Sequence, residues 1–187
     1  VPNRLVPSAL WWIPGSLLVS MIFAGLGGLA GSRRRRPLPS GVWAGGMVWV
    51  AAGATLFLIL VGGMVTGHEA GLAVVDWPNS YGYQMFLYPL SRMTGGVFYE
   101  HAHRLFGSLV GLVTVVLAVQ IWRVDDRRWI RGLAVLAVVM VIAQGVLGGL
   151  RVTGHFTMSS PPDDVAPDLR LAVVHGITAQ CFLALLM

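Results

Sequence analysis

Charged side chains are scarce in this sequence. Asp and Glu number 8 and Lys and Arg 13 among 187 residues, so charged residues make up 11% of the chain against 56% hydrophobic residues. The mean hydropathy is +0.73, and a soluble domain averages about 25% charged residues. Too few polar side chains are present to coat a water-soluble globule, so we expect the chain to lie in a lipid bilayer.

Lysine is absent, and all 13 basic residues are arginines. In a nucleic-acid-binding domain the arginines would be spread over the folded surface. The distribution of the arginines here argues against that class of protein. Most of them gather in two short clusters between apolar runs, at residues 33–36 and at Arg123, Arg127, Arg128 and Arg131. Such clusters are typical of the cytoplasmic loops of membrane proteins.

Cysteine is nearly absent too, with Cys181 alone in an apolar run. A single cysteine excludes an intrachain disulfide and a cysteine-based metal site, and we expect it to be a small buried hydrophobe. The chain starts at Val1 without a methionine and stops at Met187 inside an apolar run, which leaves a fragment of a longer protein as one interpretation.

Five apolar segments predict helices. They run from Ser8 to Ala30, from Val42 to Val65, from Glu100 to Trp122, from Ile130 to Val152 and from Leu169 to Met187. A helix needs roughly 20 residues to cross about 30 Å of hydrocarbon. The sequence therefore predicts an all-α integral membrane protein. Residues 42–187 would form a four-helix transmembrane bundle, and residues 1–41 one extra N-terminal transmembrane helix with an arginine-rich cytoplasmic loop.

The arginine clusters also predict the orientation. If residues 33–36 and 123–131 are cytoplasmic, the long connections at about 66–99 and 153–168 lie outside. Alternate crossing of the membrane by the five segments gives the same result. The segments that begin near Glu100 and Leu169 then both run from the outside to the inside.

The second and fourth segments end alike. Gly62-Gly63 precedes Thr66-Gly67-His68, and Gly148-Gly149 precedes Thr153-Gly154-His155. Both segments lead outward into outer loops. This sequence similarity between the two segment ends is one indication of a repeated helix pair.

Five histidines occur, and their positions separate them. His68 and His155 fall in the predicted outer loops and are interpreted as solvated. His101, His103 and His175 lie at or inside membrane spans, where ionisable residues are costly and are usually functional. His101 is two positions from His103 and points about 200° away on a helix, so we interpret it as an interfacial residue outside the site of His103.

His103 and His175 predict a heme site. Each lies near the outer start of its helix, at a depth of roughly 5–9 Å. Two histidines on separate parallel helices can bind one heme iron from its two faces, because neutral imidazole is a heme ligand. Small residues share their helix faces, which fits a flat macrocycle and also fits close helix packing. They are Gly107 and Gly111 beside His103, and Ala172, Gly176 and Ala179 around His175.

Three charged residues accompany this pair. Glu100 precedes His103 by three residues, so both face one way. Its carboxylate is suited to moving protons at a heme edge or to pairing with Arg104 at i+4. Arg104 and Arg151 lie at the outer interface, where they are candidate heme propionate contacts or snorkelling cations.

The run Glu100-His101-Ala102-His103-Arg104 resembles the Glu-x-x-His-Arg motif of the heme A synthase family. Residues 71–82, which contain Asp76-Trp77-Pro78, resemble its outer-loop motif Gly-Leu-x-Cys-Pro-Asp-Trp-Pro-x-Cys-x-Gly. The resemblance covers about residues 42–187, and further matches follow in the same order, namely Gly62-Gly63, Gln144 to Gly149, and His175.

This resemblance implies an oxidoreductase of cytochrome oxidase assembly. Such an enzyme oxidises a porphyrin methyl of heme O to the formyl of heme A, with water as the oxygen source. It implies Glu100 as the catalytic carboxylate, and His103 and His175 as ligands of the iron of the substrate heme O. Asp76, Trp77 and Pro78 would form the family's outer-loop motif at this site.

The family also implies two homologous four-helix halves. Residues 42–187 resemble the N-terminal half, and a heme b cofactor is expected in a second half that these 187 residues lack, so we expect the chain alone to bind heme without completing the oxidation. Heme O synthase and membrane lipid are implied partners, whereas the electron acceptor and a homo-oligomer stay open. We expect a bacterial inner membrane, with the heme site toward the outer face.

The chain departs from the family pattern at three positions. The loop cysteine pair falls at Val74 and Ser80, and the usual arginine after Gly-Gly falls at Thr66. Two other functions remain open. A membrane b-type cytochrome for electron transfer would use the same histidines without Glu100, and a heme-handling protein derived from this fold would bind heme without catalysis.

Overall fold

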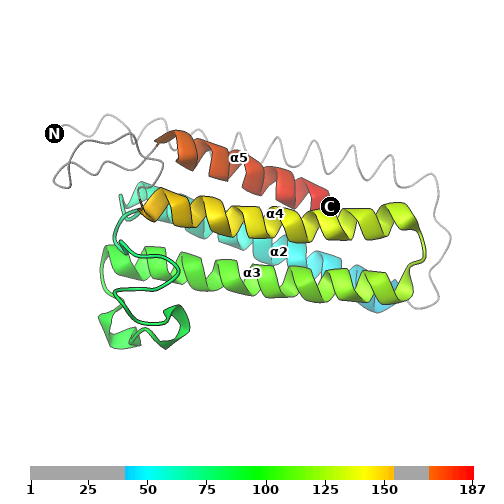
Figure 1. The fold of residues 1–187 in the computed structure, drawn as a ribbon, viewed down its shortest axis with the longest axis horizontal. Coiled ribbons are helices and arrows are strands. Elements are labelled where there is room, and N and C mark those ends of the chain that lie inside the picture. Colours follow the sequence, from blue (N-terminus) through cyan, green and yellow to red (C-terminus); the bar gives the residue numbers. More distant parts are fainter. Residues whose placement is uncertain (1–40, 154–168) are drawn as a thin grey trace.

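The computed structural model describes residues 41–153 and 169–187. Four long α-helices fill these residues (Figure 1): α2 (Gly41–Gly67), α3 (Gly96–Val124), α4 (Arg128–Thr153) and α5 (Leu169–Leu186). Two short 3-10 turns, η1 (Met85–Leu87) and η2 (Leu90–Arg92), lie between α2 and α3. The predicted helices after residue 41 are thus confirmed, and their ends extend by up to four residues. The predicted helix from Ser8 to Ala30 lies outside the described residues.

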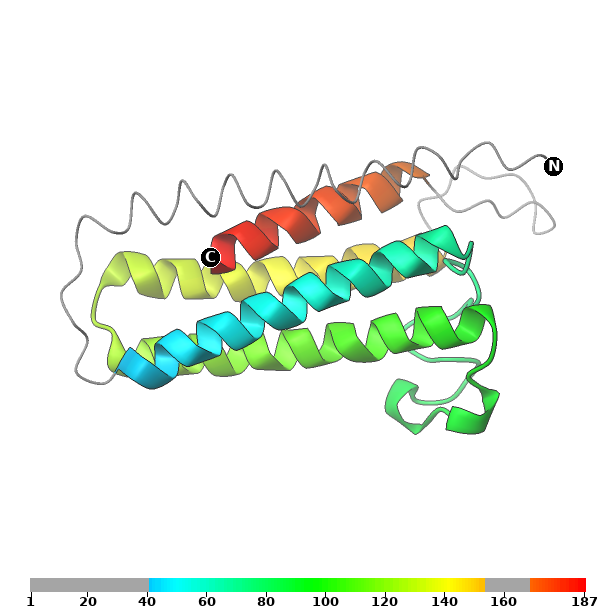
Figure 2. The same cartoon turned by 180° about the vertical axis from the view of Figure 1, so that it is seen from behind.

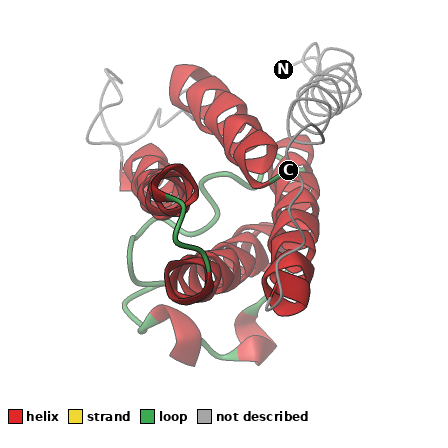
Figure 3. Ribbon diagram, turned by 90° about the vertical axis from the view of Figure 1, so that its right-hand side faces the viewer, coloured by secondary structure: helices red, strands yellow, loops and turns green. Residues whose placement is uncertain are grey.

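The helices pack side by side with their axes nearly aligned (Figures 1 and 2). α3 packs against α2 and α4, and α5 packs against α4 and α2. Seen along the axes, the four helices surround a common centre (Figure 3). α3 and α5 are therefore diagonal neighbours, with α2 and α4 on either side of the space between them.

Small and branched side chains fill the core between the helices. Ala51 and Ala52 of α2, Val110 of α3, Ala137 of α4 and Phe182 of α5 are all buried in one cluster. Small residues let apolar helices approach closely, and such contacts drive helix association in lipid. Large apolar side chains are exposed instead on the outside, including Leu112, Val139 and Ile142, as expected for surfaces solvated by lipid.

Among the described residues, three helices are long and apolar enough to cross a membrane, at Gly45–Gly67, Gly96–Val124 and Arg128–Val152. α5 is an apolar helix of only 18 residues, and its crossing stays a prediction. Cys181 is exposed on α5, so the prediction that it is buried is wrong. The physical reason is that an apolar residue of a membrane helix faces lipid as readily as the core.

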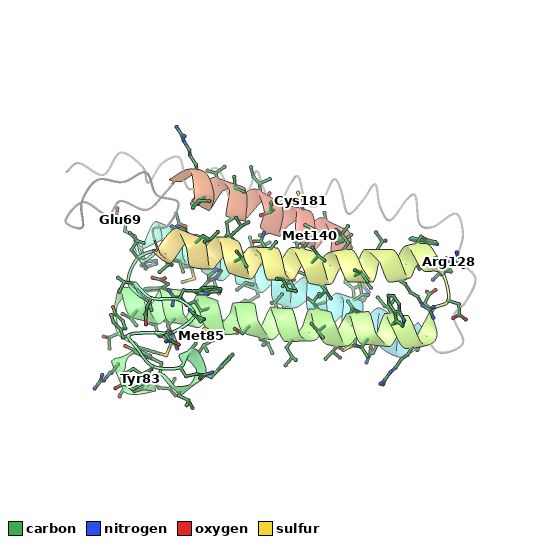
Figure 4. The ribbon with its side chains drawn as sticks, viewed as in Figure 1. Glu69, Tyr83, Met85, Arg128, Met140 and Cys181 are labelled. Carbon is green, nitrogen blue, oxygen red and sulfur yellow. The ribbon has the colours of Figure 1, made fainter. Side chains whose placement is uncertain are left out.

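The two ends of the helices differ in character. We name the end that carries residues 68–95 the loop end and the end that carries the α3–α4 connection the arginine end; Glu69 and Arg128 mark them in Figure 4. At the arginine end the chain turns between α3 and α4 within Asp125, Asp126 and Arg127. Hydrogen bonds from the Arg127 side chain outweigh burial and bring the pKa of Asp125 below its ordinary value.

Candidate functional site

Residues 68–95, which we call the cap loop, leave α2 and fold over the start of α3. The first turn after the helix is closed by the Ala70 N–H, which donates to the Val65 carbonyl at 2.9 Å. Ala70, Gly71, Val74 and Ser80 are buried although they lie in a connection. The cap loop is therefore packed against the helices and is not a free surface loop.

Arg104 of α3 holds the cap loop in place. Its Nη1 donates to the carbonyls of Asp76 at 2.7 Å and Asn79 at 3.0 Å. Its Nη2 donates to the Val74 carbonyl at 2.6 Å and to Glu100 Oε1 at 2.8 Å. A planar guanidinium presents five donors in a fixed fork, which suits several acceptors at once. One side chain thus ties three points of the loop to α3.

Glu100 completes this clamp. Its Oε1 accepts from Arg104 and its Oε2 accepts from the Val74 N–H at 2.8 Å. The side chains of Arg104 and Glu100 are only 9% and 5% exposed, so the pair is not one of the weak surface pairs that solvent screens. The i+4 salt bridge considered from the sequence is present, and it serves to fix the loop.

Asp76 closes the tip of the loop on itself. Its carboxylate accepts from the N–H groups of Tyr81 at 2.6 Å and Gly82 at 2.8 Å. The backbone turns there through positive φ at Tyr81 (51°) and Gly82 (77°). Burial by itself would raise the pKa of Asp76, but the N–H donors of Gly82 and Tyr81, together with its own backbone N–H and the charge of Arg104, bring the pKa below its ordinary value.

Trp77 and Pro78 are joined by a cis peptide bond. The Trp77 ring lies directly on Gly149 of α4, where any added Cβ would overlap the ring. The predicted motif Asp76-Trp77-Pro78 therefore has a structural role at this contact. Asp76 shapes the turn, and Trp77 rests the loop on α4.

His101 is buried against the cap loop. It is 1% exposed, its Nδ1 lies 3.0 Å from Ser80 Oγ, and its ring is 4.9 Å from that of Tyr88. As the helical period predicts, it points away from the site of His103. The helical period does not reveal the path of the cap loop, which covers this face of α3, and the interfacial depth of His101 stays a prediction.

His103 and His175 meet in the space between α3 and α5. Their ring centroids are 6.4 Å apart and the ring planes lie at 80°. The Nδ1 atoms of both rings are buried and have no hydrogen-bond partner among the residues that the structure describes. A buried polar atom without a partner is costly, and here two such atoms occur on facing histidines.

A glycine flanks each of these rings. A Cβ on Gly62 of α2 would lie 2.9 Å from His103 Cε1, and a Cβ on Gly148 of α4 would lie 3.6 Å from His175 Cε1. These are the corresponding first glycines of the two Gly-Gly pairs noted in the sequence. The repeated Gly-Gly pair therefore has a structural counterpart, since α2 and α4 each place a glycine beside a histidine of another helix.

The other small residues do not mark close packing. A Cβ on Gly107, Gly111 or Gly176 would meet no atom within 4 Å. Close helix contact, one of the two interpretations of these glycines, is therefore not their role within the described residues. Ala172 and Ala179 are half-buried on α5 beside His175.

Arg151 lies between the cap loop and the histidine pair. Its guanidinium covers Gly71, where a Cβ would come within 2.5 Å of Nη2. Its charge acts on the rings of both His103 and His175. Its Nε is buried without a hydrogen-bond partner among the described residues. Of the two arginines predicted at the heme propionates, Arg151 acts by its charge on both histidines, whereas Arg104 acts on His103 and is bonded to the loop.

The remaining histidines lie apart from the pair or outside the described residues. His68 is exposed, its Nδ1 is 2.9 Å from the Met64 carbonyl, and it stacks on Tyr99 at 4.1 Å. His155 lies outside the described residues. The sequence indicated no role for Thr178, which accepts a hydrogen bond from Gln144 and donates to the Val174 carbonyl at 2.7 Å, with the His175 carbonyl at 3.2 Å. The signal that could have indicated Gln144 and Thr178 is their polar character within apolar spans.

Apolar spans around two facing, half-buried histidines define the chain as an α-helical membrane protein with a histidine pair between its helices. The model of a family described as cytochrome oxidase assembly protein matches residues 45–187. The chain belongs to this family, the heme A synthase family. No solved structure matches the chain.

Three curated relatives are named heme A synthase. That of Shouchella clausii is 29% identical over 71% of this chain and 40% of its own length, and that of Geobacillus kaustophilus is 26% identical over 74% and 41%. That of Halalkalibacterium halodurans is 30% identical over 50% and 30%. The chain thus spans less than half the length of these relatives. With its apolar spans, this membership makes it a membrane protein.

The contact between Trp77 and Gly149 can be tested by adding one methyl group at residue 149. We expect Gly149→Ala to push the Trp77 ring off α4 and to destabilise the protein by about 1–3 kcal/mol, the usual cost of overpacking. Thermal unfolding in detergent measures this loss. Gly145→Ala, one turn earlier on α4 and open at its Cβ, is the matched control, and equal melting of the two variants would contradict the contact.

The Arg104 clamp predicts a local effect. In Arg104→Lys a single ammonium replaces the fork, so we expect amide hydrogen exchange across residues 74–80 to become about tenfold faster, which corresponds to about 1.4 kcal/mol of opening free energy. Arg123→Lys, at an exposed arginine of the arginine end, should leave these amides unchanged. Unchanged exchange in Arg104→Lys would mean that the loop is held by other contacts.

Proposed function

We propose that this chain binds heme O between His103 and His175 and contributes to its oxidation in heme A biosynthesis. The observation that carries the proposal is the spacing of the two rings. Two metal–imidazole bonds of about 2 Å each, with about 1 Å inside each ring, separate the centroids by about 6 Å. The observed separation is 6.4 Å, which is the spacing for one iron between the two imidazoles.

Two further observations support this fit. The Nδ1 atoms of both rings are buried without a hydrogen-bond partner among the described residues, which supports a site completed by a bound group. Gly62 and Gly148 leave the sides of the rings free of Cβ atoms. We propose His103 and His175 as the iron ligands, and the bound heme O supplies the methyl group that is oxidised.

Arg151 is the proposed partner of a heme propionate. It stands at the loop end of the histidine pair, its charge reaches both rings, and its Nε is buried without a partner among the described residues. A charge-assisted contact to a carboxylate would satisfy this donor. Arg104 remains a predicted propionate contact, but its two terminal nitrogens already donate to the loop and to Glu100.

Glu100 is the proposed catalytic carboxylate. Oxidation of a methyl group with water as the oxygen source releases protons, and Glu100 lies on α3 three residues before a proposed ligand. In the structure the carboxylate holds the Val74 N–H and Arg104, so accepting a proton would also weaken the clamp on the cap loop. An electron-transfer cytochrome would need neither this carboxylate nor the loop that it holds.

The orientation follows from the arginines. We propose that the arginine end, with Arg123, Arg127, Arg128 and Arg131, is cytoplasmic, and that the loop end with the heme site faces outward. The three relatives come from bacteria, which supports a bacterial inner membrane. Heme O synthase as the supplier of heme and a heme b in a second half stay predictions from the family.

The ligands are tested by spectroscopy. We expect His103→Ala and His175→Ala each to abolish or alter the low-spin heme spectrum of the purified protein, because one axial nitrogen is lost. His68→Ala removes an exposed histidine at the same end and should leave the spectrum unchanged. Wild-type spectra in both ligand variants would contradict the proposal that His103 and His175 bind the heme iron.

The role of Glu100 is tested by separating binding from chemistry. In the full-length protein, Glu100→Gln keeps an acceptor for the Val74 N–H but loses the basic carboxylate. If Glu100 takes a proton, we expect heme binding to persist and formyl-heme production to fall by about 10²-fold or more. Arg104→Lys disturbs the same clamp without removing the carboxylate and should lose less. Formyl-heme at the wild-type rate in Glu100→Gln would show that Glu100 is not catalytic.

A further inference from the structure

The second half of the cap loop forms a short arm, residues 85–92, that contains η1 and η2. Three large apolar side chains on it are exposed, namely Phe86 (62%), Leu87 (75%) and Leu90 (77%). The arm does not cover the top of the bundle. It folds back and lies beside the first turns of α3, on the outside of the molecule (Figures 1, 2 and 3).

The depth of the arm follows from the length of α3. This helix has 29 residues, or about 43 Å at 1.5 Å per residue, and the hydrocarbon core of a bilayer is about 30 Å thick. The first turns of α3 therefore extend into the interfacial layer. Since the arm lies beside these turns, it lies at the level where lipid headgroups meet the acyl chains.

Exposed aromatic residues occur at both ends of the helices, at the depths expected for the two membrane interfaces. Trp122 and Trp129 are exposed at the arginine end, and Tyr81, Tyr83 and Phe98 are exposed at the loop end. Trp122 and Phe98 are 24 residues apart on α3, or about 36 Å, which is close to the distance between two interfaces. Trp and Tyr collect in such belts because one edge of the ring is apolar and the other polar.

The surface of the arm continues the lipid-facing surface of α3. Phe98, Leu109 and Leu112 of α3 are exposed apolar residues. The polar groups of the arm suit the headgroup layer. Arg92 is exposed, donates to the Tyr83 hydroxyl at 3.3 Å and lies over the Tyr83 ring at 5.6 Å. Figure 4 shows Tyr83 and Met85 where the arm leaves the rest of the loop.

We propose that the arm is a membrane-interface anchor that inserts Phe86, Leu87 and Leu90 into the outer leaflet. Its partner is the lipid surface itself, and Arg92 lies at the level of the phosphates. Tyr88, between the two turns of the arm, is buried and packs on His101 at 4.9 Å. The anchor is thereby connected to the helix that carries His103, and lipid supports the cap loop from the side that the protein leaves open. This inference does not depend on the proposed heme chemistry.

Spin labels test the anchor directly. In a Cys181→Ser background the full-length protein receives a nitroxide at Leu87→Cys or Leu90→Cys and is placed in vesicles of phosphatidylethanolamine and phosphatidylglycerol. Collision rates are measured with oxygen, which concentrates in lipid, and with a neutral nickel chelate, which stays in water. Leu112→Cys on the lipid face of α3 and Asp126→Cys at the arginine end, where the Asp126 side chain is fully exposed, serve as lipid and water references.

We expect the ratio of oxygen to nickel collisions at both arm positions to exceed that at residue 126 by about tenfold and to approach that at residue 112. A ratio equal to that at residue 126 would place the arm in water and overturn the proposal. Low collision rates with both reagents would also overturn it, because they mean that the arm is covered by protein. The two arm side chains are among the most exposed in the described chain, so replacing them removes little packing.

Discussion

The position of the cap loop depends on one guanidinium shared between a loop and a helix. A charged side chain is tolerated in a buried place only when its donors are used, and Arg104 uses its terminal nitrogens on three loop carbonyls and Glu100. The loop makes few regular backbone hydrogen bonds of its own. The contacts of Trp77 with Gly149 and of Gly71 with Arg151 therefore follow from where Arg104 holds it.

The helices were predictable and the loop was not, for different physical reasons. A membrane helix needs only a long apolar run, so the prediction of Val42 to Val65 differs from the observed Gly41–Gly67 by one or two residues at each end. The acceptors of Arg104 are backbone carbonyls 25 to 30 residues away. Every residue has such a carbonyl, so the sequence contains no signal that selects these three.

The site itself was partly predictable. Helical period and depth brought His103 and His175 together and turned His101 away, as the structure has them. The same reasoning treated Arg104 and Arg151 alike, because both lie at the predicted outer interface. Only the path of the loop separates them, since the loop accepts three hydrogen bonds from Arg104 and none from the buried Nε of Arg151. The repeated Gly-Gly pair was the signal for Gly62 and Gly148, but sequence alone does not show which ring each glycine faces.

Val74 and Ser80, where the family's cysteine pair would fall, are both fully buried. Each is bonded to α3, Val74 through its N–H to Glu100 and Ser80 through its hydroxyl to His101. Hydrogen bonds break and re-form by thermal fluctuation, whereas a disulfide opens only by thiol exchange. The cap loop is thus held to α3 at these two positions by hydrogen bonds and not by a disulfide. How often the loop opens is decided by a local free energy, which does not depend on whether its surroundings are oxidising or reducing.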